Sequence, residues 1–385
     1  MANVFTIPPG APFAQTLADE LIRQVGARDD PLALARATIY VPTRRAVRSL
    51  GEIFARSVGG AALLPDIRPL GDVDEDDLLF DAVSEDVELL PAISTVRRRL
   101  LLATLIVRWQ RNRDGSTMGF AQASRLARSL GAFLDEVQTQ GAALKDLDKL
   151  APTALSQYWE DVRSFLLLLG DEWPPLLAAE NRQDHVVHRD TALRTLAQRL
   201  KAKPPEGPVI AAGSTGSIPA TAELLDVISN LPMGAVVLPG LDLSLDETSW
   251  NGIDPGHPQF GMRQLLERIG VARDAVKVWG GADRAATPRE VVLRETLRPA
   301  PTTDAWRALA DSGTEVIEKG LEGLSLVDAA DPAQEATIIA LMLREVLESE
   351  GQTGALVTPD RDLARLGAAE LGRWNVAIDD SAGLP

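Results

Sequence analysis

Basic side chains gather at one turn of this acidic chain. Residues 39–50 read IYVPTRRAVRSL, in which the first residues favour a short strand, Pro42 ends it and Thr43 is a good N-cap for an amphipathic helix. Arg44 and Arg45 then fall in the first turn of that helix, where an exposed positive charge opposes the helix dipole by about 0.3–1 kcal/mol. Because this placement does not serve helix stability, we predict that these residues bind an anion.

A second basic cluster lies on a long helical pattern that begins near residue 91. Arg97, Arg108 and Arg111 fall on one face of the predicted helix and form a basic stripe. Two interpretations remain open, a solvated charged face or contact with the phosphate backbone of DNA. Trp109 beside the stripe suits either base stacking or a place in the core.

The composition restricts the class of protein. Zero cysteines exclude disulfides and thiolate metal sites within this sequence and suit a reducing cytoplasm. No run matches a signal peptide or the ~20 apolar residues of a membrane span, so we expect a soluble, cytoplasmic protein without membrane contact. The net charge of -16 opposes nonspecific adhesion to nucleic acid, but nine acids lie in residues 72–88 and leave only -7 for the remainder. We expect that segment to be a solvated loop and helix start, or a surface for a basic partner.

Alternating strand and helix patterns predict an α/β protein with a parallel sheet. Residues 1–70 begin the first α/β domain, 71–206 hold the acidic segment and a helical insertion, 207–300 complete the domain, and 301–385 form a linker and the beginning of a second α/β domain. In that last part we expect strands at 323–329, 353–360 and 375–380. The sequence stops about 60 residues into this unit, which predicts a fragment or a chain that continues.

This plan resembles that of superfamily 1 helicases, which are built from RecA-type domains. Residues 39–54 resemble helicase motif Ia, and residues 331–380 resemble the opening of the second motor domain. More closely, the segments VFTIPPGAPF, PTRRAVRSL, IRPLGDVDEDD, AAGSTGSIPATAELL, VVLPGLDLSLDE, HPQF and VTPDRDLA, in their order and spacing, resemble the N-terminal part of the AddB family in its alphaproteobacterial form.

The resemblance implies a role in DNA double-strand break repair. AddB subunits scan DNA for a recombination hotspot while an AddA subunit supplies the motor, so the implied partners are single-stranded or forked DNA and an AddA-like helicase-nuclease subunit. It further implies that Thr43 donates its hydroxyl to a phosphate and that Arg44 and Arg45 neutralise phosphates. Without the resemblance, a surface pair bonded to nearby acids remains an alternative.

The first strand-to-helix turn stands where a helicase carries its P-loop. A working P-loop reads GxxxxGK[ST], in which Lys meets the β and γ phosphates and Ser/Thr binds magnesium. The turn here contains Pro9 and Gly10, with Phe13 at the lysine position and Ala14 at the hydroxyl position, and its prolines cannot donate N–H groups. We therefore predict a degenerate nucleotide loop without ATP hydrolysis and expect no cofactor in this chain, although a nucleotide held without hydrolysis stays open.

A glycine-containing turn follows the predicted strand at 208–213. Gly213, Ser214, Thr215 and Gly216 are small enough for a phosphate to approach their backbone N–H groups. Tight packing of the turn and contact with a DNA backbone or a nucleotide remain the two interpretations.

Other candidates for catalysis or metal binding are weak. Asp135 and Glu136 look like a helicase DExx box, but the surrounding apolar residues recur at helical spacing, which predicts a helix face. His185 and His188 have no third convergent ligand, so we expect no metal site. The leading hypothesis is a helicase-like scaffold that binds DNA and a partner without ATPase chemistry. The alternatives are an active nucleotide-dependent helicase and a protein-interaction scaffold without DNA affinity.

Overall fold

The computed structural model describes residues 2–30, 32–58, 63–70, 89–146, 157–281, 286–311 and 314–381. The acidic segment at 72–88 lies outside these residues. The chain divides into two compact units, Met1–Ser312 and Gly313–Pro385. Within the described ranges no helix is both long enough and apolar enough to cross a membrane.

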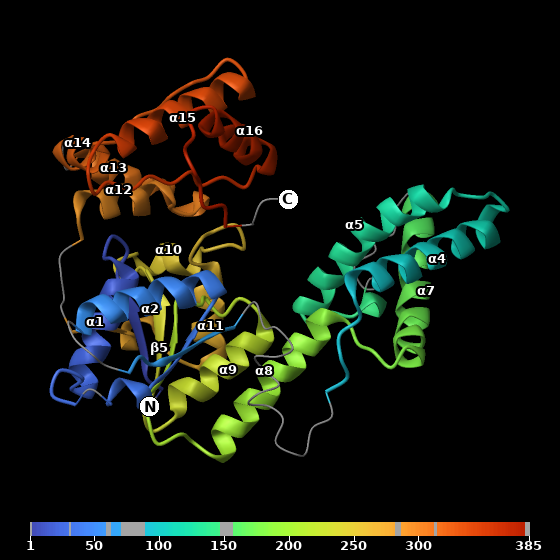
Figure 1. Ribbon diagram of the computed structural model, residues 1–385, viewed down its shortest axis with the longest axis horizontal. Coiled ribbons are helices and arrows are strands. Elements are labelled where there is room, and N and C mark those ends of the chain that lie inside the picture. The colour runs from blue at the N-terminus through green and yellow to red at the C-terminus, as the bar shows by residue number, and fades with distance from the viewer. Residues whose placement is uncertain are drawn as a thin grey trace. The chain divides into compact units, whose positions relative to one another are not determined.

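The first unit is built on a six-stranded parallel sheet, which confirms the α/β class (Figure 1). The strand order is β3-β2-β4-β5-β1-β6, and every pairing is parallel. β4 is buried along its whole length, as a parallel sheet that is covered on both faces requires. The strands are β1 (Val4–Ile7), β2 (Thr38–Val41), β3 (Asp66–Pro69), β4 (Val209–Ala212), β5 (Gly234–Pro239) and β6 (Lys277–Val278).

Two helices from the start of the chain cover one face of the sheet (Figure 1). α1 (Phe13–Val25) buries Leu17 and Leu21, and α2 (Arg44–Val58) buries Leu50 and Phe54. These side chains pack on the residues of β2, β4 and β5 that point to this face. Burying each of them from water contributes about 1.5–3 kcal/mol.

The opposite face is covered by helices from the second half of the first unit. α8 (His185–Ala202) and α9 (Pro219–Asn230) lie side by side against the sheet (Figure 1). α10 (Glu247–Asn251) and α11 (Phe260–Ile269) complete this layer. Besides the helices of the insertion, the first unit also contains α12 (Pro288–Thr296), α13 (Trp306–Asp311) and short 3-10 turns at Leu34–Arg36, Leu144–Asp146, Arg273–Ala275 and Ala300–Ala305.

The insertion is helical, as the sequence predicts. α4 (Thr95–Asp114), α5 (Phe120–Thr139) and α7 (Gln157–Ala179) form a core of their own, and α8 leads back to the sheet. Asp135 and Glu136 lie on α5 rather than after a buried strand, so the interpretation against a DExx box is confirmed.

A buried charge network joins these helices to the start of α8. Arg98 is 6% exposed and lies 2.7 Å from Oδ1 of the fully buried Asp184 and 2.8 Å from Oδ1 of Asp135. The guanidinium N–H groups are not well aligned with these oxygens, so the contacts are close ion pairs rather than ideal hydrogen bonds. The second oxygen of Asp184 accepts hydrogen bonds from Nε2 of Gln138 at 2.6 Å and Nε1 of Trp173 at 2.8 Å.

The second unit is helical in its described residues 314–381. It contains α14 (Glu315–Leu321), α15 (Pro332–Leu347) and α16 (Arg361–Gly372), with Asp331 and Asp360 capping the last two. The strands that we predicted at 323–329, 353–360 and 375–380 are wrong: those segments pair with no strand within 314–381. Leu326 and Val357 are 97% and 93% exposed, so apolar side chains that suggested buried strands lack the sheet neighbours that such strands need.

Candidate anion-binding edge of the sheet

The carboxyl ends of the parallel strands bring separate loops to one edge. Ligands of open α/β sheets bind at this edge, where backbone N–H groups and helix starts converge. The degenerate loop after β1, the arginine turn after β2 and the glycine turn after β4 all lie here. The structure therefore assembles three of the four groups that the sequence singled out.

Phe13 is the point at which these loops meet. A Cβ atom added at Gly213 would lie 3.5 Å from Cε1 of Phe13 and 3.5 Å from Cδ of Pro42. Phe13 begins α1, Pro42 follows β2 and Gly213 follows β4, so the three turns lie close together around Gly213. Phe13 therefore places an apolar ring at the turn between β1 and α1.

The loop after β1 is held by a turn hydrogen bond and lies beside the loop after β5, with Pro9 and Gly10 exposed. A Cβ at Gly240, which follows β5, would lie 3.6 Å from Cβ of Pro9. The N–H of Ala11 donates to the carbonyl of Pro8 at 3.2 Å, which closes the turn on itself around Gly10. Ala14 is partly buried in the hydrophobic cluster beneath α1 and offers no hydroxyl.

Thr43 caps α2, as the sequence predicts. Its Oγ1 accepts a hydrogen bond from the N–H of Ala46 at 3.1 Å. Because the cap uses the oxygen only as an acceptor, the hydroxyl proton can still be donated. Arg44 and Arg45 occupy the first turn of α2 with exposed side chains.

The glycine turn after β4 is shaped by packing on α11. Gly213 and Gly216 have φ angles of +80° and +63°, and a Cβ at Gly216 would lie 2.7 Å from the side chain of Leu265. Oγ of Ser214 accepts from the N–H of Gly216 at 3.3 Å, and Oγ1 of Thr215 lies 3.4 Å from where a Cβ of Gly261 would be. Tight packing on Leu265 therefore accounts for Gly216, and the left-handed backbone conformation accounts for Gly213.

Sequence reasoning missed the residues that fix the loop after β5. Nε2 of Gln259 donates to the carbonyl of Gly240 at 3.0 Å, and its Oε1 accepts from the N–H of Asp242 at 3.1 Å. A cavity of about 130 Å³ lies beside this loop and is lined by Asp242, Glu290 and Arg294, among others. The only signal in the sequence was the HPQF segment, in which nothing distinguishes Gln259 as a clamp.

The fourth predicted group lies on the insertion rather than at the sheet edge. Arg97 contacts both carboxylate oxygens of Glu180 at 3.1 and 2.5 Å, and Arg108 forms an ion pair with Glu172. Glu172 lies on α7 and Glu180 directly follows that helix, so both arginines pair with acids of the insertion while their side chains stay about half exposed to solvent. The hydrogen bond to Glu180 raises the pKa of Arg97 and lowers the pKa of the carboxyl. Arg111 is exposed, and the described residues contain no ion pair with it.

The described residues offer no metal site, and comparison with known proteins identifies no family. Among the residues that the structure describes, no group of three or more His, Asp or Glu side chains is arranged to hold a metal ion. Comparison with protein-family models and with curated proteins finds no match for this chain.

Proposed function

We propose that this chain is the DNA-binding, helicase-like region of a subunit that acts in DNA double-strand break repair without hydrolysing ATP. Its partner is an AddA-like motor subunit, and its compartment is the cytoplasm. The proposal combines the resemblance of the sequence with the chemistry of the sheet edge.

The observation that carries the proposal is the convergence at Phe13. The apolar ring of Phe13 beside Gly213 supports the loss of nucleotide chemistry, because no ammonium group can reach the β and γ phosphates from that position. The closeness of Pro42 to Gly213 brings the turn that contains Arg44 and Arg45 beside the glycine turn. A nucleic acid phosphate is an anion that suits this pair of features.

Single-stranded DNA is the ligand class that best fits two exposed arginines in the first turn of α2. Each neutralised phosphate releases counterions, which makes affinity fall as salt rises, with a slope of about -0.7 per phosphate for single strands. Two arginine contacts therefore account for a slope of about -1.4, and they carry no sequence information directly.

The test is fluorescence anisotropy of labelled single-stranded and forked DNA across a salt series. The double substitution Arg44→Ala/Arg45→Ala is compared with Arg125→Ala/Arg128→Ala, which removes two exposed arginines of α5 instead. We expect the first pair to weaken binding by roughly 10-fold to 30-fold and to flatten the salt slope by about 1.4, and the second pair to leave both unchanged.

Two results would favour the alternatives. Absence of binding to the unsubstituted chain at low salt supports a protein-interaction scaffold, which the net charge of -16 also suits. Nucleotide binding with measurable turnover by the purified chain supports an active helicase. An equal loss of affinity in both double variants removes the sheet edge from the DNA path.

A further inference from the structure

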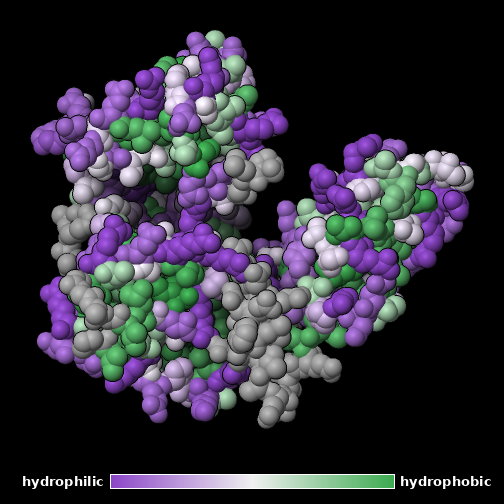
Figure 2. Space-filling model, viewed as in Figure 1, coloured by the Kyte–Doolittle hydropathy of each residue, from purple (hydrophilic) through white to green (hydrophobic). Residues whose placement is uncertain are grey.

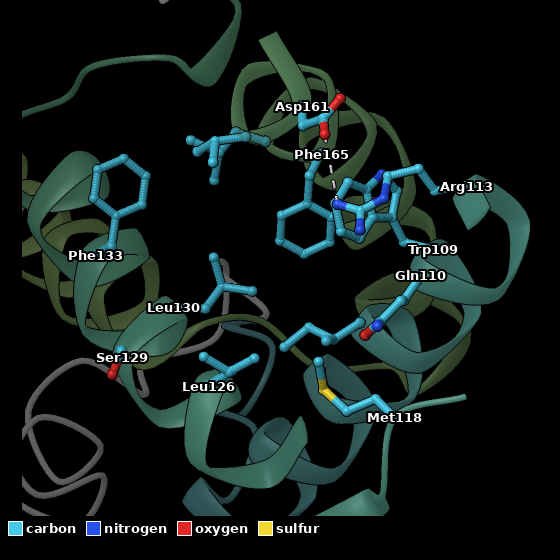
Figure 3. A pocket seen from close by; sticks show the side chains of 13 residues that line it. Trp109, Gln110, Arg113, Met118, Leu126, Ser129, Leu130, Phe133, Asp161 and Phe165 are labelled. Atoms are coloured by element: carbon cyan, nitrogen blue, oxygen red, sulfur yellow. Dashed lines mark ion pairs between the residues drawn. The ribbon is translucent and has the colours of Figure 1, made fainter. Parts of the chain in front are cut away.

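An open pocket in the helical insertion lies between α4, α5 and α7. Its volume is about 600 Å³, within the ~300–1,000 Å³ of pockets that hold small molecules. Thirteen side chains from the insertion line it, nine of them apolar, and they surround an open centre in Figure 3. Hydrophobic side chains also reach the surface over α4 and α5, with hydrophilic ones around them (Figure 2).

Aromatic side chains form a fixed wall of this pocket. The ring of Trp109 packs on that of Phe165 with centroids 4.9 Å apart, and the guanidinium of Arg113 lies 4.7 Å from the Trp109 centroid. Phe133 and Leu130 face them from α5 across the open centre. Trp109 is thus held from two directions, so a flat apolar ligand meets a preformed surface and loses little free energy to rearrangement.

The polar end of the pocket is lined by Arg113 and Asp161, and the carboxylate of Asp114 lies beside Arg113 just outside the lining. Arg113 donates to Oδ2 of Asp114 at 2.6 Å, whereas Oδ2 of Asp161 lies 3.7 Å from its other terminal nitrogen. Hydrogen bonds from Ser116 and Arg113 hold the pKa of Asp114 at about 2, so that carboxyl is ionised at neutral pH. The guanidinium of Arg113 is therefore shared by two carboxylates, and the carboxylate of Asp161 lies farther from it than that of Asp114.

We propose that this pocket binds a small aromatic ligand whose polar end is a cation or an N–H donor. The aromatic body lies against Trp109, Phe133 and Phe165, where it removes their half-exposed surface from water. The polar end pairs with Asp161. This site uses no residue of the sheet edge and does not depend on the DNA-binding function.

The probes are three compounds that share naphthalene rings. N-phenyl-1-naphthylamine is neutral with one N–H, 8-anilinonaphthalene-1-sulfonate adds an anionic group to the same rings, and 1-naphthylmethylamine is cationic and serves as a competitor. Titration of the full chain, followed by probe fluorescence, is expected to give a Kd on the order of 10 µM for the neutral probe. The sulfonate should bind at least about tenfold more weakly, since the polar end repels an anion.

Substitutions locate the binding. Ser129→Trp fills the pocket from α5, and its matched control Arg128→Trp adds the same ring on the exposed side of that helix. We expect the first to raise the Kd of the neutral probe at least about tenfold and the second to leave it unchanged. Asp161→Asn should weaken the cationic competitor by about 3-fold to 10-fold while sparing the neutral probe, and circular dichroism checks that each variant folds.

Three outcomes overturn the proposal. The first is probe binding that Ser129→Trp does not change, which assigns it to other exposed apolar surface. The second is tighter binding of the sulfonate than of the neutral probe, which reverses the charge assignment. The third is displacement of the probe by single-stranded DNA, which makes the pocket a base-stacking site.

Discussion

The strongest stability prediction concerns Arg98, the cation at the centre of the helical insertion. Arg98→Met keeps the aliphatic stem of the side chain and removes only the guanidinium. Asp184, which is fully buried, then loses its cationic partner while it retains the hydrogen bonds from Gln138 and Trp173. The substitution therefore leaves Asp184 as an uncompensated buried charge, and it also removes the partner of the partly exposed Asp135.

Removing one partner of a buried ion pair typically costs about 3–5 kcal/mol. Two features of the network place the expected loss near the lower end, about 3 kcal/mol. The contacts of Arg98 are poorly aligned as hydrogen bonds, and two neutral donors continue to satisfy the other oxygen of Asp184. Combining Arg98→Met with Asp184→Asn should cost clearly less than the sum of the single losses, with a coupling of about 2 kcal/mol.

The assay is urea unfolding followed by circular dichroism and by the fluorescence of Trp173, which lies inside the network. Arg97→Met is the matched control, because Arg97 neighbours Arg98 on α4 but its side chain is 52% exposed in its pair with Glu180. We expect a lower midpoint for Arg98→Met at an unchanged m-value and a much smaller change for the control. Equal losses in the two variants, or a double variant that is simply additive, would refute the role assigned to the buried charge.

Three further predictions test other parts of the first unit. The backbone N–H of Ser249 and, to a smaller extent, the side chain of Arg298 donate to Asp246 and hold the pKa of this carboxyl at about 2, below its ordinary 3.8. The stability that ionised Asp246 adds to the fold is therefore complete above about pH 4 and is lost as the pH falls toward 2. Asp246→Asn should remove about 1 kcal/mol of acid-dependent stability, discounted for a half-exposed group, and acid titration of unfolding checks it. Gly216→Ala should lower the unfolding free energy by about 2 kcal/mol, because the new Cβ would overlap Leu265 of α11. The control Gly281→Ala has open space at a similar φ and should lower it by about 1 kcal/mol. Similar losses for the two variants would show that packing on α11 is unimportant. Phe13→Lys should not restore ATP turnover in a phosphate-release assay, since the prolines of the loop still lack N–H donors; turnover would contradict the assignment of a degenerate loop.

The sheet of the first unit was largely predictable because its strands are continuous apolar runs. β1, β2, β4 and β5 fall on segments whose apolar residues indicate burial on both faces, and β6 lies within the segment AVKVW at 275–279. β3 was missed because Asp66–Pro69 contains a single large apolar residue and pairs only at the edge of the sheet. Similar apolar runs in the second unit form no strand among residues 314–381, since a short run has no strand structure without a neighbour to pair with.

Some features of the candidate site depend on residues that are close in sequence and could be predicted, whereas others depend on contacts between distant residues and could not. The cap at Thr43 and the loss of the P-loop lysine at Phe13 are local, and both follow from a few neighbouring residues. The pairing of Arg97 with Glu180 joins residues 83 positions apart, so no helical wheel of α4 alone could reveal it. The clamp by Gln259 and the pocket beside Trp109 depend in the same way on how distant helices pack.

The charges at the sheet edge also limit the course of a bound strand. On the side of β2 and β4, the edge presents Arg44 and Arg45 next to a glycine turn. On the side of β5 and β6, the lining of the small cavity includes two carboxylates, Asp242 and Glu290, and a single arginine that lies 3.9 Å from Asp242. A phosphate backbone gains energy over the first half and is repelled over the second. A strand bound at this edge is therefore expected to cross β2 and β4 and to turn away before the position that a nucleotide occupies in a working motor.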